Sequence, residues 1–177
     1  LPRLARQRTF AFAQENRGMS AAPKPGGKQA IEAYWLDYQR ACQVQVPGFS
    51  ATAFGHTRSI ADELAQLIAA GDKRAHASLQ SDFEADDEEL PRPGDHVVVL
   101  NGQGLPVAIV RTTHVERRYF NEIDAEFAFE CGEGDRSLAY WLIAYRQEFA
   151  ERAEAQGLQV SDRAVLLLEY FERVWPQ

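Results

Sequence analysis

The chain has 177 residues, of which 45% are hydrophobic and 25% charged, and its formal net charge is −7. This length suits one domain with a proper core, and no apolar run approaches the roughly 20 residues that a membrane span needs. Its two cysteines, Cys42 and Cys131, form no CxxC pair. This disfavours a disulfide framework or a zinc knuckle and fits a reducing, cytoplasmic compartment.

The charges are unevenly distributed along the chain. Residues 1–28 carry six basic groups and one acid, whereas the remainder carries 13 basic and 25 acidic groups. An acidic body repels a long polyanion over most of its surface, so any nucleic-acid contact must be local and sensitive to salt. The composition therefore disfavours a general RNA or DNA coat protein, but it allows a nucleotide or a short RNA segment as ligand.

Residues 1–27 are predicted to be disordered and to precede a single domain formed by residues 28–177. The segment is rich in Gly, Pro, Ala and Ser around Met19, which is the only methionine. We expect translation to start at Met19, so that residues 1–18 are an upstream extension. A targeting peptide is the alternative, because the segment is rich in arginine and poor in acids.

The first half of the body contains two predicted helices and a strand. Apolar residues recur at helical spacing over residues 28–43 and 60–68, and the second helix has Thr57 or Ser59 as a cap and Gly71 past its end. Residues 73–80 alternate, which predicts a strand with two different faces. One face has the small apolar side chains with Lys73, and the other has Arg74, His76, Ser78 and Gln80.

Residues 82–89 contain six acids. We interpret them as a solvated loop. A multi-carboxylate cation site is the alternative, but the segment lacks the ligand alternation and the glycine of a calcium loop. No metal-ligand spacing occurs elsewhere, and we expect no metal or other cofactor.

The second half predicts more strands and helices. Residues 91–95 form a turn into a buried strand, 96–100, and Asn101 to Gly104 connect it to a returning strand, 107–115. A short helix over 122–129, a long helix over 137–156 and a strand near 164–174 follow. Short strands joined by hairpins and interrupted by helices indicate an α+β domain with a small curled or barrel-like sheet.

Two glycine-containing turns carry the chemistry, Gly71 to Ser78 and Cys131 to Trp141. In the second turn, Gly132 and Gly134 allow the backbone to come close to another group, and Asp135 or Ser137 can cap the following helix. A lysine and a carboxylate from these turns, brought into one cleft, can support proton transfer or nucleophilic chemistry. They can equally form an ordinary ion pair.

These motifs resemble the ASCH domain family, which shares the PUA-like barrel architecture. The resemblance covers roughly residues 54–175 and implies an α+β fold with a PUA-like curled barrel and flanking helices. The matching residues are Ala61-Asp62-Glu63-Leu64, Gly71-Asp72-Lys73, Ala75, Ser78, Pro91-Arg92-Pro93-Gly94-Asp95, Gly102, Gly104, Pro106, Gly132-Glu133-Gly134-Asp135-Arg136-Ser137-Leu138 and Trp141.

The resemblance implies binding of RNA or of modified nucleosides. Some members are similar to small amidohydrolases that remove an acyl group from acetylated cytidine with a lysine, a threonine and a glutamate, and others have been described as ribonucleases. The lysine corresponds to Lys73, and the glutamate corresponds to Glu133. His76 stands where the family has threonine, Cys131 where it has glutamate, and Tyr145 where it has histidine.

Seven residues are the predicted site. Lys73, His76 and Glu133 are the candidate catalytic groups, and Ser78, Asp135, Trp141 and Tyr145 are the candidate ligand contacts.

Each candidate also has a structural alternative. Lys73 can be a surface lysine, His76 a space-filling residue, and the two aromatic rings a helix face packed on the sheet. Of Glu133 and Asp135, Asp135 is the better candidate to cap the helix predicted over residues 137–156. Cys131 is either a nucleophile paired with His76 or a small apolar filler. Three arginines form either a basic rim or ordinary solvated surface: Arg111, Arg117 and Arg118.

Three functions follow from the sequence. The leading hypothesis is recognition of a nucleoside or a short RNA segment in a cleft beside the barrel. The alternative is a metal-independent amidohydrolase acting on an acylated nucleoside, and the third is a binding-only domain that has lost catalysis. A basic rim would favour RNA, and a closed pocket sized for one nucleoside would favour the amidohydrolase. If Lys73 and Glu133 pointed into solvent on different faces, both site hypotheses would fail.

Overall fold

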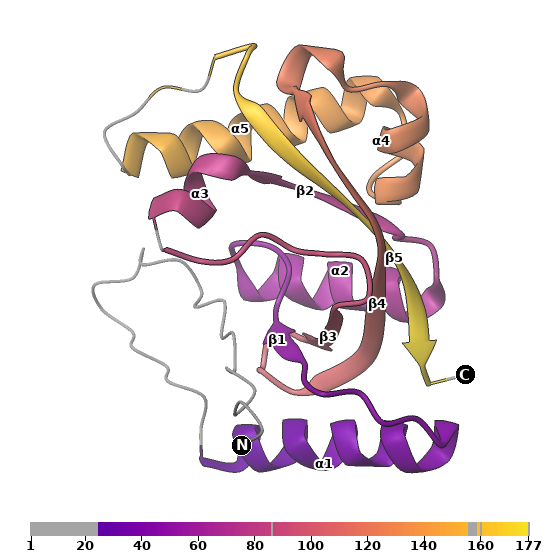
Figure 1. The fold of residues 1–177 in the computed structure, drawn as a ribbon. Coiled ribbons are helices and arrows are strands. Elements are labelled where there is room, and N and C mark those ends of the chain that lie inside the picture. Colours follow the sequence, from indigo (N-terminus) through magenta and orange to yellow (C-terminus); the bar gives the residue numbers. More distant parts are fainter. Residues whose placement is uncertain (1–24, 86, 156–158, 160, 177) are drawn as a thin grey trace. The chain divides into compact units, whose positions relative to one another are not determined.

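The computed structural model describes residues 25–85, 87–155, 159 and 161–176 (Figure 1). The elements are α1 (Pro25–Cys42), β1 (Ser50–Thr52), α2 (Arg58–Ala70), β2 (Ala75–Leu79), α3 (Gln80–Ala85), β3 (His96–Leu100), β4 (Pro106–Tyr119), η1 (Phe120–Glu122), α4 (Ala125–Cys131), α5 (Leu138–Ala155) and β5 (Val165–Trp175). Five strands form one mixed sheet in the order β1-β3-β4-β5-β2, and together with the helices this agrees with the predicted α+β class.

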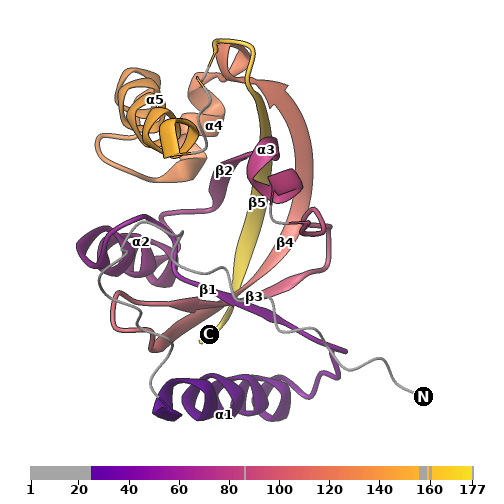
Figure 2. The ribbon, with the colours of Figure 1, turned by 90° about the vertical axis from the view of Figure 1, so that its left-hand side faces the viewer.

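The chain divides into two compact units, and β4 and β5 contribute residues to both. The described part of the first unit consists of residues 25–71, 94–111 and 172–176. Within it, α1 and α2 lie on opposite sides of β1 and β3 (Figures 1 and 2). The Thr57 side chain accepts a hydrogen bond from the Ile60 amide, and Gly71 ends α2 with a left-handed φ of 83°. Both predicted ends of this helix are therefore confirmed.

The strands of the first unit pack on an aromatic core. β1 runs parallel to β3, and β3 pairs antiparallel with β4 through the predicted hairpin. The Asn101 side chain accepts hydrogen bonds from the amides of Gln103 and Leu105, each at 3.0 Å. Four buried residues form the centre of the core: Trp35, Tyr38, Val98 and Ile109.

The second unit consists of residues 72–93 and 112–171. In it β2 pairs antiparallel with β5, and α4 and α5 lie together on one side of these strands (Figure 2). Ala75, Ala77 and Leu79 of β2 are buried, as the alternation predicted. They belong to a core that also contains Phe120, Phe127, Cys131, Trp141, Tyr145, Phe149, Leu166 and Leu168.

The structure corrects several sequence predictions. The acidic segment begins as a helix, α3, because Phe83 packs inward at 6% exposure and anchors the turn. The helix predicted over 122–129 is broken into η1 and α4, since Asp124 is an effective N-cap whose side chain accepts from the Phe127 amide. β1 was not anticipated.

The first helix, α1, begins at Pro25, three residues before the predicted helical segment. The predictions for Met19 and for the rest of the N-terminal segment fall on residues 1–24, which lie outside the described residues.

Candidate functional site

A buried lysine lies two residues before β2. Lys73 is 1% exposed. Its neighbour Arg74 is fixed at both backbone groups: the Arg74 amide donates to the Glu130 carbonyl at 2.8 Å, and the Phe171 amide donates to the Arg74 carbonyl at 2.9 Å. This segment is therefore held against α4 and β5. The alternative of a surface lysine is wrong, and a buried charge needs partners.

Lys73 has two partners, both from the second glycine turn. Its Nζ donates to Oε1 of Glu133 at 2.5 Å and to the backbone carbonyl of Cys131 at 3.2 Å. The side chain of Glu133 remains 15% exposed. The two residues singled out as a lysine–carboxylate pair are thus in contact, and the carboxylate connects the buried ammonium to the surface.

The two glycines of this turn, on either side of Glu133, each allow a close approach to another group. Gly132 ends α4 with a φ of 74°, and a Cβ at this position would lie 2.3 Å from the carbonyl oxygen of Asp72. Gly134 has a φ of 55°, and a Cβ there would lie 2.4 Å from the ring of Tyr140. The groups that these glycines approach are therefore the backbone next to Lys73 and an aromatic ring of α5.

Tyr145 supplies a second donor to the carboxylate. Its hydroxyl donates to Oε1 of Glu133 at 2.7 Å. Burial, with Cys131 and Glu133 nearby, raises the pKa of Tyr145 well above its usual 10, so the phenol stays protonated. Because Lys73 and Tyr145 both bond to Oε1, Oε2 is the oxygen left to accept a proton from water or a ligand.

The comparison with known protein families identifies the family of this chain. The sequence model of the ASCH domain matches residues 50–175. The chain belongs to the ASCH domain family. The confirmed resemblance spans both units, and it leaves the binding or catalytic role of each site residue as a prediction.

Two solved structures resemble this ASCH chain closely. The ASCH domain from Lactobacillus crispatus JV V101 is 30% identical, covers 86% of this chain and 99% of its own, and has a TM-score of 0.79. Protein EF3133 from Enterococcus faecalis V583 is 27% identical, covers 82% and 88%, and has a TM-score of 0.76. No curated protein matches the chain. The α+β ASCH fold expected from the sequence is thereby confirmed.

The sequence predicts three departures from the ASCH pattern, and the structure places these residues near the ion pair or beside Tyr145. The carbonyl of Cys131 accepts from Lys73, the hydroxyl of Tyr145 donates to Glu133, and the ring of His76 lies 6.4 Å from that of Tyr145. Each of the three residues therefore contacts Lys73, Glu133 or Tyr145.

His76 and Ser78 lie on the same face of β2, two residues apart, and both are partly buried. Burial, followed by the charges of Lys73 and Arg152, holds the pKa of His76 well below its usual 6.5. The imidazole is neutral at pH 7, so it can accept or donate a hydrogen bond but carries no charge.

The thiol of Cys131 does not suit nucleophilic chemistry. It is 0% exposed, and burial raises its pKa to about 11. A thiol is reactive as a thiolate, so the hypothesis of a Cys131–His76 nucleophile is not supported. The residue serves the site through its backbone carbonyl, for which the sequence carries no signal.

Trp141 and Tyr145 stack on each other, with ring centroids 4.3 Å apart and an interplanar angle of 14°. They are 1% and 2% exposed. A nucleobase could not stack on either ring without displacing core side chains, so a direct ligand contact stays a prediction for both.

Asp135 and Ser137 share the cap of α5. The Asp135 side chain accepts from the Ser137 amide at 2.9 Å, and Ser137 Oγ accepts from the Tyr140 amide at 3.1 Å. Hydrogen bonds from Ser137 lower the pKa of Asp135, which stays charged. The capping role expected of these residues is present, and a ligand contact by Asp135 stays a prediction.

The three arginines considered as a basic rim differ in their partners. Arg111 pairs with Glu172, and Arg118 pairs with Glu116 and Asp124. Arg117 has no ion pair within the described part of the chain, and it lines two surface hollows of about 430 and 720 Å³ beside the acidic segment. Neither hollow is lined by Lys73 or Glu133. Arg111 and Arg118 are therefore already neutralised by carboxylates.

Among the residues that the structure describes, no group of three or more His, Cys, Asp or Glu side chains is arranged to hold a metal ion. Over the same residues, no helix combines the length and apolarity that crossing a membrane requires.

Proposed function

We propose that this ASCH domain binds a modified nucleoside, free or within a short RNA segment, at Lys73 and Glu133, and hydrolyses an acyl group from its exocyclic amine. The observation that carries the proposal is the fixing of Glu133 Oε1 by Lys73 and Tyr145. A carboxylate held at one oxygen, with the other left for water, is suited to act as a general base.

The reaction follows from this geometry with N4-acetylcytidine as the example. Glu133 Oε2 takes a proton from a water molecule, and the water oxygen bonds to the acyl carbon. The carbon–nitrogen bond then breaks, and the amine takes the proton from Glu133. The products are cytidine and acetic acid, which releases its proton to water and becomes acetate.

Lys73 and His76 assist the reaction in different ways. Lys73 has three N–H donors, of which Cys131 and Glu133 take two. The third can reach the negative charge that develops on the carbonyl oxygen only after the groups that bury the ammonium move aside. His76 is neutral near pH 7. It can therefore orient water or the nucleobase through a hydrogen bond, but it does not act as a positively charged general acid.

Binding without hydrolysis is the second candidate. The side chain of Lys73 is 0% exposed, so a bound substrate reaches its ammonium only if the surrounding groups move. This burial favours a static site in which Lys73 fixes Glu133 and takes no part in a reaction.

The test is incubation of the purified chain with N4-acetylcytidine, with cytidine followed by chromatography. A parallel titration uses N4-ethylcytidine, in which a methylene group replaces the carbonyl and prevents hydrolysis. Cytidine release supports the hydrolase. Binding of N4-ethylcytidine without cytidine release supports the binding-only candidate. If neither binding nor release occurs with folded protein, both candidates are wrong.

A further inference from the structure

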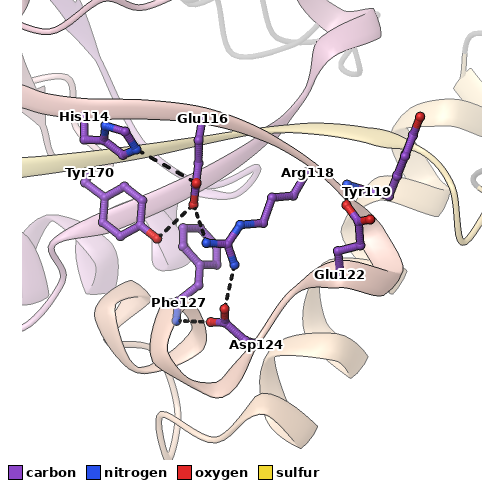
Figure 3. Close-up of polar contacts among 8 residues, drawn as sticks. All are labelled: His114, Glu116, Arg118, Tyr119, Glu122, Asp124, Phe127 and Tyr170. Atoms are coloured by element: carbon purple, nitrogen blue, oxygen red, sulfur yellow. Dashed lines mark hydrogen bonds and ion pairs between the residues drawn. The ribbon is translucent and has the colours of Figure 1, made fainter.

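A second polar cluster joins β4, β5 and the start of α4 (Figure 3). We define the Arg118 cluster as Glu116, Arg118, Asp124 and Tyr170. The guanidinium of Arg118 donates to Asp124 at 2.6 Å and contacts Glu116 at 2.7 Å. The Tyr170 hydroxyl donates to the same Glu116 oxygen at 3.3 Å. One isolated exposed ion pair contributes little, but here one guanidinium bridges two carboxylates that are fixed by other contacts.

Asp124 connects this cluster to α4. It is the N-cap of the helix, and its Oδ1 accepts from the Phe127 amide at 2.9 Å while Oδ2 accepts from Arg118. These two hydrogen bonds lower the pKa of Asp124, so the carboxylate is charged at neutral pH. The start of α4 is thereby held against β4.

The other end of α4 belongs to the candidate site. The helix has only seven residues, which at 1.5 Å per residue is about 10 Å. Its last residue, Cys131, gives the carbonyl that accepts from Lys73, and Glu133 follows two residues later. A displacement of α4 at Asp124 would therefore be transmitted to both members of the ion pair.

A row of aromatic rings makes a second connection. Tyr170 packs edge-to-face on Phe127 at 5.5 Å, and Phe127 packs edge-to-face on Trp141 at 5.9 Å. Trp141 stacks on Tyr145, whose hydroxyl holds Glu133. Through this row the Arg118 cluster is connected to Tyr145, which donates to Glu133. Through α4 it is connected to the Cys131 carbonyl, which accepts from Lys73.

We propose that Arg118 and Asp124 are positioning residues that hold Lys73 and Glu133 in their hydrogen-bonded geometry through α4. The consequence for catalysis rests on the proposed function, whereas the effect on geometry does not. Arg117 is the matched control, because it is adjacent on β4, exposed, and without an ion pair in the described part of the chain.

The first test measures the geometry without using activity. Cys131 is completely buried at the end of α4, so its reaction with a thiol reagent reports opening of this helix. In a Cys42→Ser background, we expect Arg118→Ala and Asp124→Asn to raise the labelling rate at least tenfold, and Arg117→Ala to leave it unchanged. Arg118→Lys, which keeps the charge but reaches one carboxylate, should give an intermediate rate. Should Arg118→Ala fail to fold, the Asp124→Asn and Arg118→Lys variants make the same comparison.

The second test measures hydrolysis of N4-acetylcytidine well below the melting temperature. The positioning role predicts that Arg118→Ala lowers kcat about tenfold with little change in KM, and that Arg118→Lys recovers part of the loss. Equal labelling rates in the Arg118 and Arg117 variants would overturn the proposal. Faster labelling in a protein that never releases cytidine would support positioning and contradict the hydrolase. Unchanged kcat in Arg118→Ala of an active enzyme would contradict the catalytic consequence.

Discussion

At the scale of the residue, the environment of Lys73 decides what it can do. Its ammonium is removed from solvent and satisfied by a carboxylate and a carbonyl. Burying a charge is tolerated only with such partners, and removing one partner leaves the other uncompensated. The adjacent pair Arg74–Glu130 has the same chemistry on the surface, with 49% and 27% of the side chains exposed.

These two pairs give a matched test of stability. We expect Lys73→Met to lower the free energy of unfolding by about 3 kcal/mol, because it leaves Glu133 without its cation. Arg74→Met should lower it by less than about 1 kcal/mol, because its pair is solvated. Urea denaturation of both variants measures the difference. Equal losses would mean that the burial of Lys73 has no energetic consequence.

Part of this site could be predicted from the sequence. Sequence reasoning identified Lys73 and Glu133, because a lysine and an acid in two glycine turns is a local pattern. It did not identify the carbonyl of Cys131 or the bridge made by Arg118, because a backbone acceptor has no residue signature and the bridge depends on tertiary contacts. Tyr145 was named as a ligand contact, but the structure places its hydroxyl on Glu133.

At the scale of the element, local signals predicted the ends of α2, and tertiary packing decided α3. Thr57 and Gly71 act on their own helix, so their roles are readable from sequence. α3 lies in an acid-rich segment and depends on burial of Phe83, which the local pattern does not contain. The turn after α4 depends on a local signal and on a tertiary contact, since Gly132 ends the helix and also lies close to the backbone of Asp72.

A comparison of Gly71 with Gly132 distinguishes helix termination from close approach to another backbone. Both have left-handed φ values, 83° and 74°, but only at Gly132 would a Cβ meet another backbone. We expect Gly71→Ala to cost roughly 1 kcal/mol from conformational strain alone. Gly132→Ala should cost at least about 2–3 kcal/mol, because the turn must also move away from Asp72. Urea midpoints measured at equal slope test this, and equal costs would contradict the close approach.

At the scale of the whole molecule, the net charge bears on which ligands the protein can bind, and the titration of its histidines bears on how its stability depends on pH. The body is acidic, and Arg111 and Arg118 are already paired with carboxylates. Contact with a long RNA is therefore less favoured than contact with a nucleoside or a short segment.

Each unit also contains a histidine whose pKa is lowered mainly by burial, His76 and His96. His96 donates from Nδ1 to the Gly94 carbonyl at 2.9 Å, and Nε2 lies 3.3 Å from the Tyr38 hydroxyl. In the unfolded chain both imidazoles take up a proton near pH 6.5, whereas in the folded chain they do so only at lower pH. Their contribution to stability is therefore complete above pH 6.5 and is lost as the pH falls towards the folded-state pKa values.

We expect the stability of the wild type to fall more steeply at acid pH than that of a His76→Gln/His96→Gln double variant. Between pH 7.5 and pH 5, we expect the free energy of unfolding of the wild type to fall by on the order of 1–2 kcal/mol more than that of the variant. Urea denaturation at both pH values measures this. Parallel losses in the two proteins would contradict the assignment.

The most direct test of the central claim, that Glu133 is the base of a nucleoside site, is the rate of cytidine release from N4-acetylcytidine by Glu133→Gln and Glu130→Gln. Both changes remove one carboxylate that is paired with a basic residue, at Lys73 and Arg74 respectively. We predict a loss of at least 100-fold for Glu133→Gln, in line with the roughly 10²–10⁴-fold contribution of a general base, and a rate within about twofold of wild type for Glu130→Gln. Equal rates for the two folded variants would contradict the claim.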